Sequence, residues 1–216
     1  MKKYELTSDT KIVFGHILYR IKALSSFGCV SAGDLGGFLE SEKNLSQNGD
    51  AWVYGDAEVY GDARVYGDAR VYGDAWVYGD AWVYGDAEVY GDARVYGDAE
   101  VYGDARVYGD ARVYGNAEVY GNAEVYGNAR VYGNAEVCKI GAVFWIGAIG
   151  SRNRTTTFFR CKDGKIYVSC GCFLGDLEEF SDKVKQTHGD NEHGRVYMLA
   201  IEMAKARIVE EKNEVH

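Results

Sequence analysis

Apolar and polar positions alternate with a short, fixed period through the middle of this chain, from residue 49 to about residue 138. Six positions recur there fifteen times in phase: glycine, Asp or Asn, alanine, a variable residue, valine and tyrosine. In an extended unit, Ala51 and Val53 fall on one face, and Trp52 and Tyr54 fall on the other. The pattern predicts a four-residue strand followed by a two-residue corner at Gly-Asp.

A strand this short cannot bury its apolar face alone, but three strands can do so in a coil that stacks on the next coil. Fifteen units would make five coils of eighteen residues. Alanine and valine suit the narrow interior of such a coil, because larger side chains from three sides would collide. The repeat therefore predicts a mainly β fold with a three-sided parallel solenoid over residues 37–150.

The segment before the repeat predicts a small N-terminal β cap, residues 1–36. Residues 4–24 alternate loosely around Gly15, which is typical of a β-hairpin or a short meander. Leu39 and Leu45 then lie six residues apart, in phase with the alanines of the repeat. We expect them to fill a wider first coil, so that the rod begins before its sequence becomes regular.

The segment after the repeat predicts an irregular last coil at residues 143–146 and then a ββαα cap, residues 151–216. Asp163-Gly164 indicates a hairpin between residues 155–161 and 165–173. Asp176 is a candidate N-cap for a helix that runs to about residue 188, and a second helix is predicted from about 191 to 211. The apolar positions of the second helix are Val196, Leu199, Ala200, Met203 and Ile208.

The charge of the chain lies in the repeat. The net charge is −9, and residues 49–138 alone hold −11, which leaves +2 for the flanks. An acidic rod argues against nucleic-acid binding, which depends first on clustered Lys and Arg. No stretch reaches the ~20 apolar residues of a membrane span, and no signal-peptide run follows Met1. We expect a cytoplasmic protein that binds no membrane, with its five cysteines reduced.

The variable position of the repeat differs between the three faces of the predicted solenoid, since residues eighteen apart stack in columns. The columns are Trp52, Arg70, Glu88, Arg106, Glu124; then Glu58, Trp76, Arg94, Arg112, Arg130; then Arg64, Trp82, Glu100, Glu118, Glu136. The first column alternates in sign and should pair internally. The other two each stack three like charges, which either splay into water or meet the opposite column of another rod.

Fourteen tyrosines of the repeat predict three outward ladders, which stabilise a solenoid by stacking and also offer a surface to a partner. The three tryptophans fall one on each face near the N-terminal end, where the N-terminal segment or another subunit could pack. Carbohydrate stacking is an alternative. The candidate binding residues are Trp52, Trp76, Trp82, Tyr54, Tyr78, Tyr84, Arg94, Arg112, Arg130, Glu100, Glu118 and Glu136.

Two groups of residues raise a metal alternative. Asp is expected at the corners because it tolerates left-handed backbone, but columns of carboxylates about 5 Å apart also suit Ca²⁺. Cys161, Cys170 and Cys172 with His188 could hold zinc, although cysteines on a strand are more often packing residues. The prediction is that no metal or other cofactor is bound.

The unit Val-Tyr-Gly-Asp/Asn-Ala-x resembles the hexapeptide signature of left-handed parallel β-helices, and this resemblance implies the left-handed sense. Residues 33–37, 41–46 and 155–159 resemble segments of uncharacterised bacterial and prophage hexapeptide-repeat proteins, some of which are labelled acyltransferases. Acyl transfer usually needs a histidine base, yet none lies between His16 and His188, and no loop interrupts the repeat. We predict no catalytic residue and a scaffold that binds protein, including a second copy, with an acyltransferase-like enzyme or a carbohydrate- or cation-binding surface as alternatives.

Overall fold

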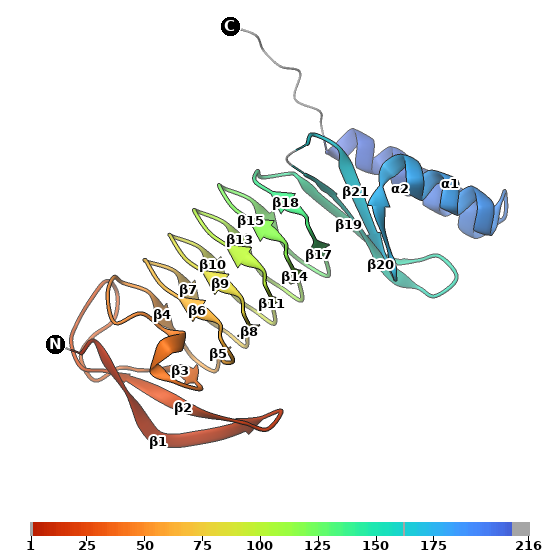
Figure 1. Cartoon of the computed structure of the whole chain (residues 1–216). Coiled ribbons are helices and arrows are strands. Elements are labelled where there is room, and N and C mark those ends of the chain that lie inside the picture. The colour runs from red at the N-terminus through yellow and green to blue at the C-terminus, as the bar shows by residue number, and fades with distance from the viewer. Residues whose placement is uncertain (1, 162, 209–216) are drawn as a thin grey trace, which may run out of the picture.

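The computed structural model describes residues 2–161 and 163–208 of the chain. The fold is mainly β: a parallel β-solenoid carries an N-terminal hairpin at one end, and an antiparallel sheet with two helices at the other (Figure 1). The predicted architecture is thus confirmed. The left-handed sense that the resemblance implies stays a prediction.

Three sheets form the sides of the rod, and each is named here by its variable residues. The arginine face contains β3 (Leu35–Leu39), β5 (Glu58–Val59), β8 (Trp76–Gly79), β11 (Arg94–Gly97), β14 (Arg112–Gly115) and β17 (Arg130–Gly133). The glutamate face contains β6 (Arg64–Val65), β9 (Trp82–Val83), β12 (Glu100–Val101), β15 (Glu118–Val119) and β18 (Glu136–Val137). The alternating face contains β4 (Trp52–Val53), β7 (Arg70–Val71), β10 (Glu88–Val89), β13 (Arg106–Val107) and β16 (Glu124–Val125).

From β4 onward, the strands of each face pair in parallel with partners eighteen residues on, as Arg94 does with Arg112. Backbone amides donate across the coils, for example from Arg94 to the Ala111 carbonyl at 2.9 Å. Every repeat alanine and valine is buried, from Ala51 to Val137. The prediction of a bore filled by these two residue types is confirmed.

The rod begins at β3, before the regular sequence, as predicted. The prediction that its two leucines occupy alanine positions is wrong, however, because Leu39 pairs with Val59 and Leu45 with Val65. Both offsets are twenty residues, so the leucines occupy valine positions of the bore rather than alanine positions. The two extra residues lie between Leu45 and Ala51, where the Gln47 side chain accepts the backbone N–H of Lys3 at 2.8 Å.

Glycine supplies the left-handed backbone at the corners, with φ between +60° and +74° from Gly49 to Gly133. None of the corner Asp or Asn residues that the structure describes has a positive φ. The prediction that Asp is chosen for left-handed backbone is therefore wrong. Instead, its backbone amide joins the coils, as when Asp80 donates to the Gly97 carbonyl at 2.9 Å.

The N-terminal hairpin, β1 (Tyr4–Val13) and β2 (His16–Ala23), extends the arginine face at its first coils. β2 pairs antiparallel with β3, and β3 pairs in parallel with β5. The buried side chain of Leu18 packs there with Phe38 and Tyr60. A 3-10 turn, Glu42–Asn44, follows β3.

The C-terminal cap is a four-stranded antiparallel sheet that carries two helices. Its strands are β19 (Val143–Ile149), β20 (Arg154–Arg160), β21 (Ile166–Cys170) and β22 (Phe173–Asp176), in that spatial order. The predicted hairpin is confirmed as β20 and β21. The expectation that residues 143–146 close the last coil is wrong, because β19 pairs antiparallel with β20.

The two helices begin close to where the sequence predicts. α1 (Leu177–His188) is capped by the Asp176 side chain, which accepts the backbone N–H groups of Glu178 and Glu179. α2 (Glu192–Arg207) follows the N-cap Asn191. It ends at Arg207, and the last part of the predicted helix, to Glu211, lies outside the described residues.

The face that α2 buries agrees with the predicted apolar positions only in part, since Ala200 and Ile208 are buried and Val196 packs partly against the cap core. Its buried side chains are Tyr197, Ala200, Ile201 and Ala204, followed by Ile208 at the C-cap. Leu199 and Met203, which we expected to face the cap, lie on the exposed side of the helix. The physical reason is that α2 has two apolar stripes at helical spacing, and the stripe with two alanines allows close packing against α1 and β19.

Candidate binding surfaces of the rod

The three repeat tryptophans have different surroundings. Trp52 is 1% exposed, and its ring packs edge-on against Tyr4 and Phe27 at centroid distances of 6.0 and 5.4 Å. Trp76 contacts Phe14, at the tip of the hairpin, at 5.6 Å. The N-terminal segment therefore covers Trp52 and touches Trp76, while Trp82 on the glutamate face stays 39% exposed.

The repeat tyrosines form three ladders along the rod, as predicted. Successive rings stack almost parallel at centroid distances of 4.7–5.6 Å, and only the first step, from Tyr54 to Tyr72, is edge-on. Tyr78 lies against the hairpin on the arginine face. Stacking at this spacing holds neighbouring coils in register, so the ladders have a structural role whatever else they bind.

The glutamates of the glutamate face are stabilised within the rod. The Tyr84 hydroxyl donates to Glu100 at 2.8 Å, and the Tyr102 hydroxyl donates to Glu118 at 2.9 Å. Burial and these hydrogen bonds raise the pKa of both tyrosines. A phenol that donates to a carboxylate lowers the cost of stacking like charges, since it delocalises part of each negative charge.

The alternating face is neutralised by its own side chains. Glu88 lies 3.5 Å from Arg70 and 3.8 Å from Arg106, and Arg106 lies 3.8 Å from Glu124. Each pair joins two neighbouring coils. The predicted internal pairing of this column is confirmed.

The arginine face has no such compensation. Among the described residues, no carboxylate lies within ion-pair distance of Arg94, Arg112 or Arg130. The Arg94 guanidinium lies 4.5 Å from the centre of the Trp76 ring, and all three side chains are half-buried. The three therefore form a partly exposed basic column along β11, β14 and β17, with the Trp76 ring against its first member.

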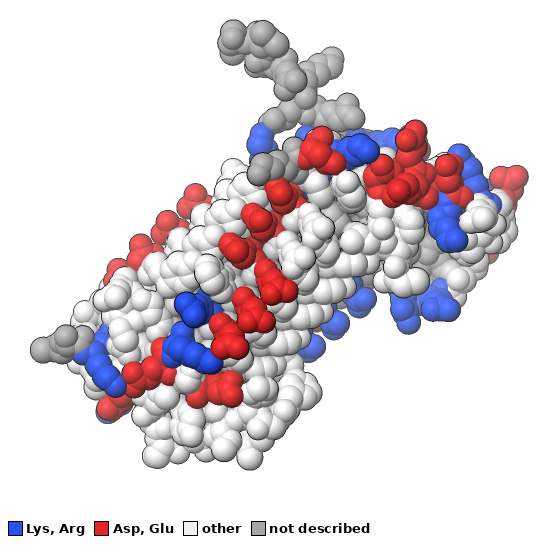
Figure 2. All heavy atoms as spheres, in the orientation of Figure 1, with Lys and Arg blue, Asp and Glu red and all other residues white. Residues whose placement is uncertain are grey.

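Acidic side chains lie in rows along the rod, and a separate basic row follows the edge where β11 and β14 lie (Figure 2). One hollow of about 410 Å³ lies among these acidic rows on the glutamate face. Its lining residues are Asp62, Arg64, Asp80, Trp82, Asp98 and Glu100. Trp82 is thus exposed beside carboxylates, a setting that favours cationic ligands over anionic ones.

The four candidate zinc ligands do not form one cluster. The Cys170 thiol lies 3.6 Å from the Tyr197 hydroxyl, while Cys172 is exposed in the following turn. Burial raises the pKa of Cys161 to about 11, and His188 packs against His193. In the described part of the chain, no group of three or more His, Cys, Asp or Glu side chains is arranged to hold a metal ion.

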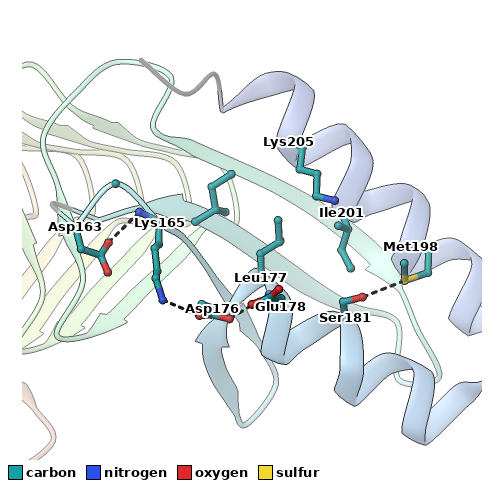
Figure 3. Close-up of a pocket in the computed structure, with 11 residues that line it drawn as sticks. Asp163, Lys165, Asp176, Leu177, Glu178, Ser181, Met198, Ile201 and Lys205 are labelled. Atoms are coloured by element: carbon teal, nitrogen blue, oxygen red, sulfur yellow. Dashed lines mark hydrogen bonds and ion pairs between the residues drawn. The ribbon is translucent and has the colours of Figure 1, made fainter. Parts of the chain in front are cut away.

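The cap contains a second hollow, of about 650 Å³, between the β20–β21 turn and the two helices (Figure 3). Leu177, Met198 and Ile201 line it with apolar side chains. At its rim Lys165 lies 3.2 Å from Asp176. That ion pair and the α1 N-cap use Lys165 and Asp176, while Glu178 and Lys205 also line the hollow.

The fold and these surfaces define a parallel β-solenoid repeat protein with both ends of the rod covered. The repeats match the family model of the YdcK Beta solenoid repeat at residues 57–73, 63–79, 69–85, 99–115, 105–121 and 123–138. No curated protein matches the chain. The similarity therefore concerns the rod, and neither the hairpin nor the C-terminal cap is included in it. Among the described residues, no helix is long and apolar enough to cross a membrane.

Proposed function

We propose that this protein is a non-catalytic scaffold whose arginine face binds an acidic segment of a protein partner. The observation that carries the proposal is the column of Arg94, Arg112 and Arg130, which stacks three positive charges with no carboxylate in ion-pair distance among the described residues. The other two columns are compensated by ion pairs or by tyrosine hydroxyls. A partner that supplies carboxylates would remove the repulsion within the one column that lacks them.

The geometry of the column favours an extended ligand. Adjacent arginines belong to paired strands, so they repeat about every 4.8 Å along the rod. Guanidinium groups bind carboxylates with two parallel hydrogen bonds, and the flanking tyrosine rings offer apolar area beside each charge. A segment that carries several Asp or Glu residues would contact the column repeatedly.

The test uses a short fluorescein-labelled oligo-glutamate peptide and fluorescence anisotropy at low ionic strength. The triple variant Arg94→Gln, Arg112→Gln, Arg130→Gln should lose binding. Its matched control replaces the other three arginines of the rod, Arg64, Arg70 and Arg106, and changes the net charge by the same amount. Equal weakening by both variants would refute a specific site, because it would show only the general attraction of acidic peptides to positive charge.

Side-by-side assembly of rods is a second candidate. Glu100, Glu118 and Glu136 stack with the same eighteen-residue register as the arginines, so the column of a second copy would match in spacing. The assembly should dissociate as salt is added, because the contact is between charges. Light scattering through a salt series measures this, and an assembly that is indifferent to salt would exclude it. An assembly role would also suit the prophage-linked context that the resemblance implies, whereas the acyltransferase alternative has no histidine on the rod to support it.

A further inference from the structure

The outer side of α2 carries apolar side chains that the cap leaves exposed. Leu199 and Met203 lie four residues apart on this side, and Val196, which packs partly against the cap core, flanks them one turn before Leu199. Leu199 is 65% exposed and Met203 is 51% exposed, although the helix already buries a separate apolar side against the cap. A helix that packs on one side only needs a single apolar stripe.

We propose that this stripe joins two copies of the chain through an antiparallel α2–α2 contact about a two-fold axis. The occupant is a second copy because the charges beside the stripe complement themselves under that symmetry. Arg195 precedes the centre of the stripe, and Glu202 follows it on the same edge. With the axis between Val196 and Leu199, Arg195 of each copy lies beside Glu202 of the other.

The apolar residues match in the same register. Val196 of one helix packs on Leu199 of the other, and this contact occurs twice around the axis. Met203 then lies over the aliphatic stem of Glu192 in the second copy. The contact thus has a small apolar centre with an ion pair on each side, which is the usual arrangement of a helix–helix interface.

The charged groups are free to make these pairs. Within residues 2–161 and 163–208, the one ion pair of Glu202 is an exposed pair with Lys205, at 2.9 Å, and such a pair adds little stability. The Arg195 guanidinium donates to the Asp190 carbonyl at 2.8 Å through Nη1, which leaves its other N–H groups for a partner. Neither group has to break a buried interaction.

The dimer leaves the proposed partner site open and depends on none of its residues. The helices lie at the opposite end of the rod from the hairpin (Figure 1), so the contact joins two rods by their caps. Two arginine faces would then belong to one particle. A bivalent particle binds a multivalent partner more tightly than one face does.

The test is sedimentation velocity across a concentration series of the full chain. We expect a dimer whose fraction rises with concentration, since an interface of two short stripes is small. Leu199→Glu should leave only monomer. Ile140→Glu, a control at a side chain that is 63% exposed outside the cap helices, should leave the dimer unchanged. A chain that stays monomeric throughout, or a dimer that Leu199→Glu does not weaken, overturns the proposal.

A charge exchange tests the register. Arg195→Glu and Glu202→Arg should each weaken the dimer by about tenfold, because each creates two like-charge contacts. The double variant should restore the original affinity, which no effect on the folding of a single chain would produce. A double variant no stronger than the single ones would overturn the antiparallel pairing. Circular dichroism of each variant shows that the helices remain folded.

Discussion

The corner glycines offer a test of how the coils are held at their spacing. Gly55 and Gly85 have similar φ values, +61° and +70°, so alanine at either position is strained in the left-handed region. Their surroundings differ. A Cβ on Gly85 would lie 2.9 Å from the backbone N of Gly103 in the next coil, whereas a Cβ on Gly55 meets only the Gly73 carbonyl oxygen, at 3.7 Å.

The two substitutions should therefore have different costs. Gly55→Ala should destabilise the chain by about 1 kcal/mol, the cost of left-handed backbone at a residue with a side chain. Gly85→Ala adds a displacement of the next coil by about half an ångström, because ordinary Cβ contacts begin near 3.4 Å. The coil is held by hydrogen bonds such as Tyr84 N–H to the Val101 carbonyl at 3.0 Å, so we expect a further ~1–3 kcal/mol.

Urea unfolding followed by circular dichroism measures this difference, provided that the slopes of the two transitions agree. The pair is its own control, since both variants add one methyl group at a corner of the first coils. Equal midpoints would refute the reasoning. They would mean that the φ value alone makes glycine necessary, and that the coils are not in steric contact at their corners.

Three further predictions concern the N-terminal cap and the ladders. The buried Glu58 carboxylate lies 2.7 Å from the Lys11 ammonium group, so Lys11→Met should lower the free energy of unfolding in urea by roughly 3 kcal/mol. Adding Glu58→Gln should recover most of this loss, and a double variant as unstable as the single one would contradict the prediction. Burial and the neighbouring Glu88 raise the pKa of Tyr72 from 10.0 to about 12. The unfolded chain therefore loses phenolic protons that the folded chain keeps, and stability should fall as the pH rises from about 10 to about 12. A thermal midpoint that stays constant across this range would be evidence against the raised pKa. Trp52→Ala should lower the free energy of unfolding by about 3–5 kcal/mol and Trp82→Ala by under about 1 kcal/mol, because the N-terminal segment buries the ring of Trp52 and not that of Trp82. Equal losses of thermal stability in the two variants would contradict this prediction.

The rod could be predicted from the sequence because its residues carry local and repeated information. A period of two within each unit puts alanine and valine inside, and a period of eighteen residues stacks the charges in columns. Both follow from strand geometry, and both are confirmed. The first coil does not follow the eighteen-residue period, because two extra residues lie before Ala51. They leave the six-residue spacing of Leu39 and Leu45 intact, so the sequence does not show that these leucines occupy valine positions.

Contacts between distant segments could not be predicted. The hairpin extends the sheet of the arginine face, and nothing in residues 4–24 alone selects that face over the other two. In the sequence, nothing distinguishes Lys11 from any other lysine on a strand, and only the fold brings it to 2.7 Å from Glu58. For α2, the sequence offers two apolar stripes of similar length, and the sheet below decides which one is buried.

The hairpin shows how a second segment can bind the arginine face. Its residues cross the first coils with complementary charge, since Lys11 pairs with Glu58 and Arg20 pairs with Asp56 at 3.2 Å. Its tip places Phe14 against Trp76 and ends there, immediately before the arginines begin. The variable position of this face therefore changes sign where its own hairpin stops: Glu58 lies under the hairpin and is paired by Lys11, whereas Arg94, Arg112 and Arg130 lie beyond it. A strand that binds beyond the hairpin by the same type of contact would carry the opposite charge to the hairpin, which supports the proposal of an acidic partner for the arginine column.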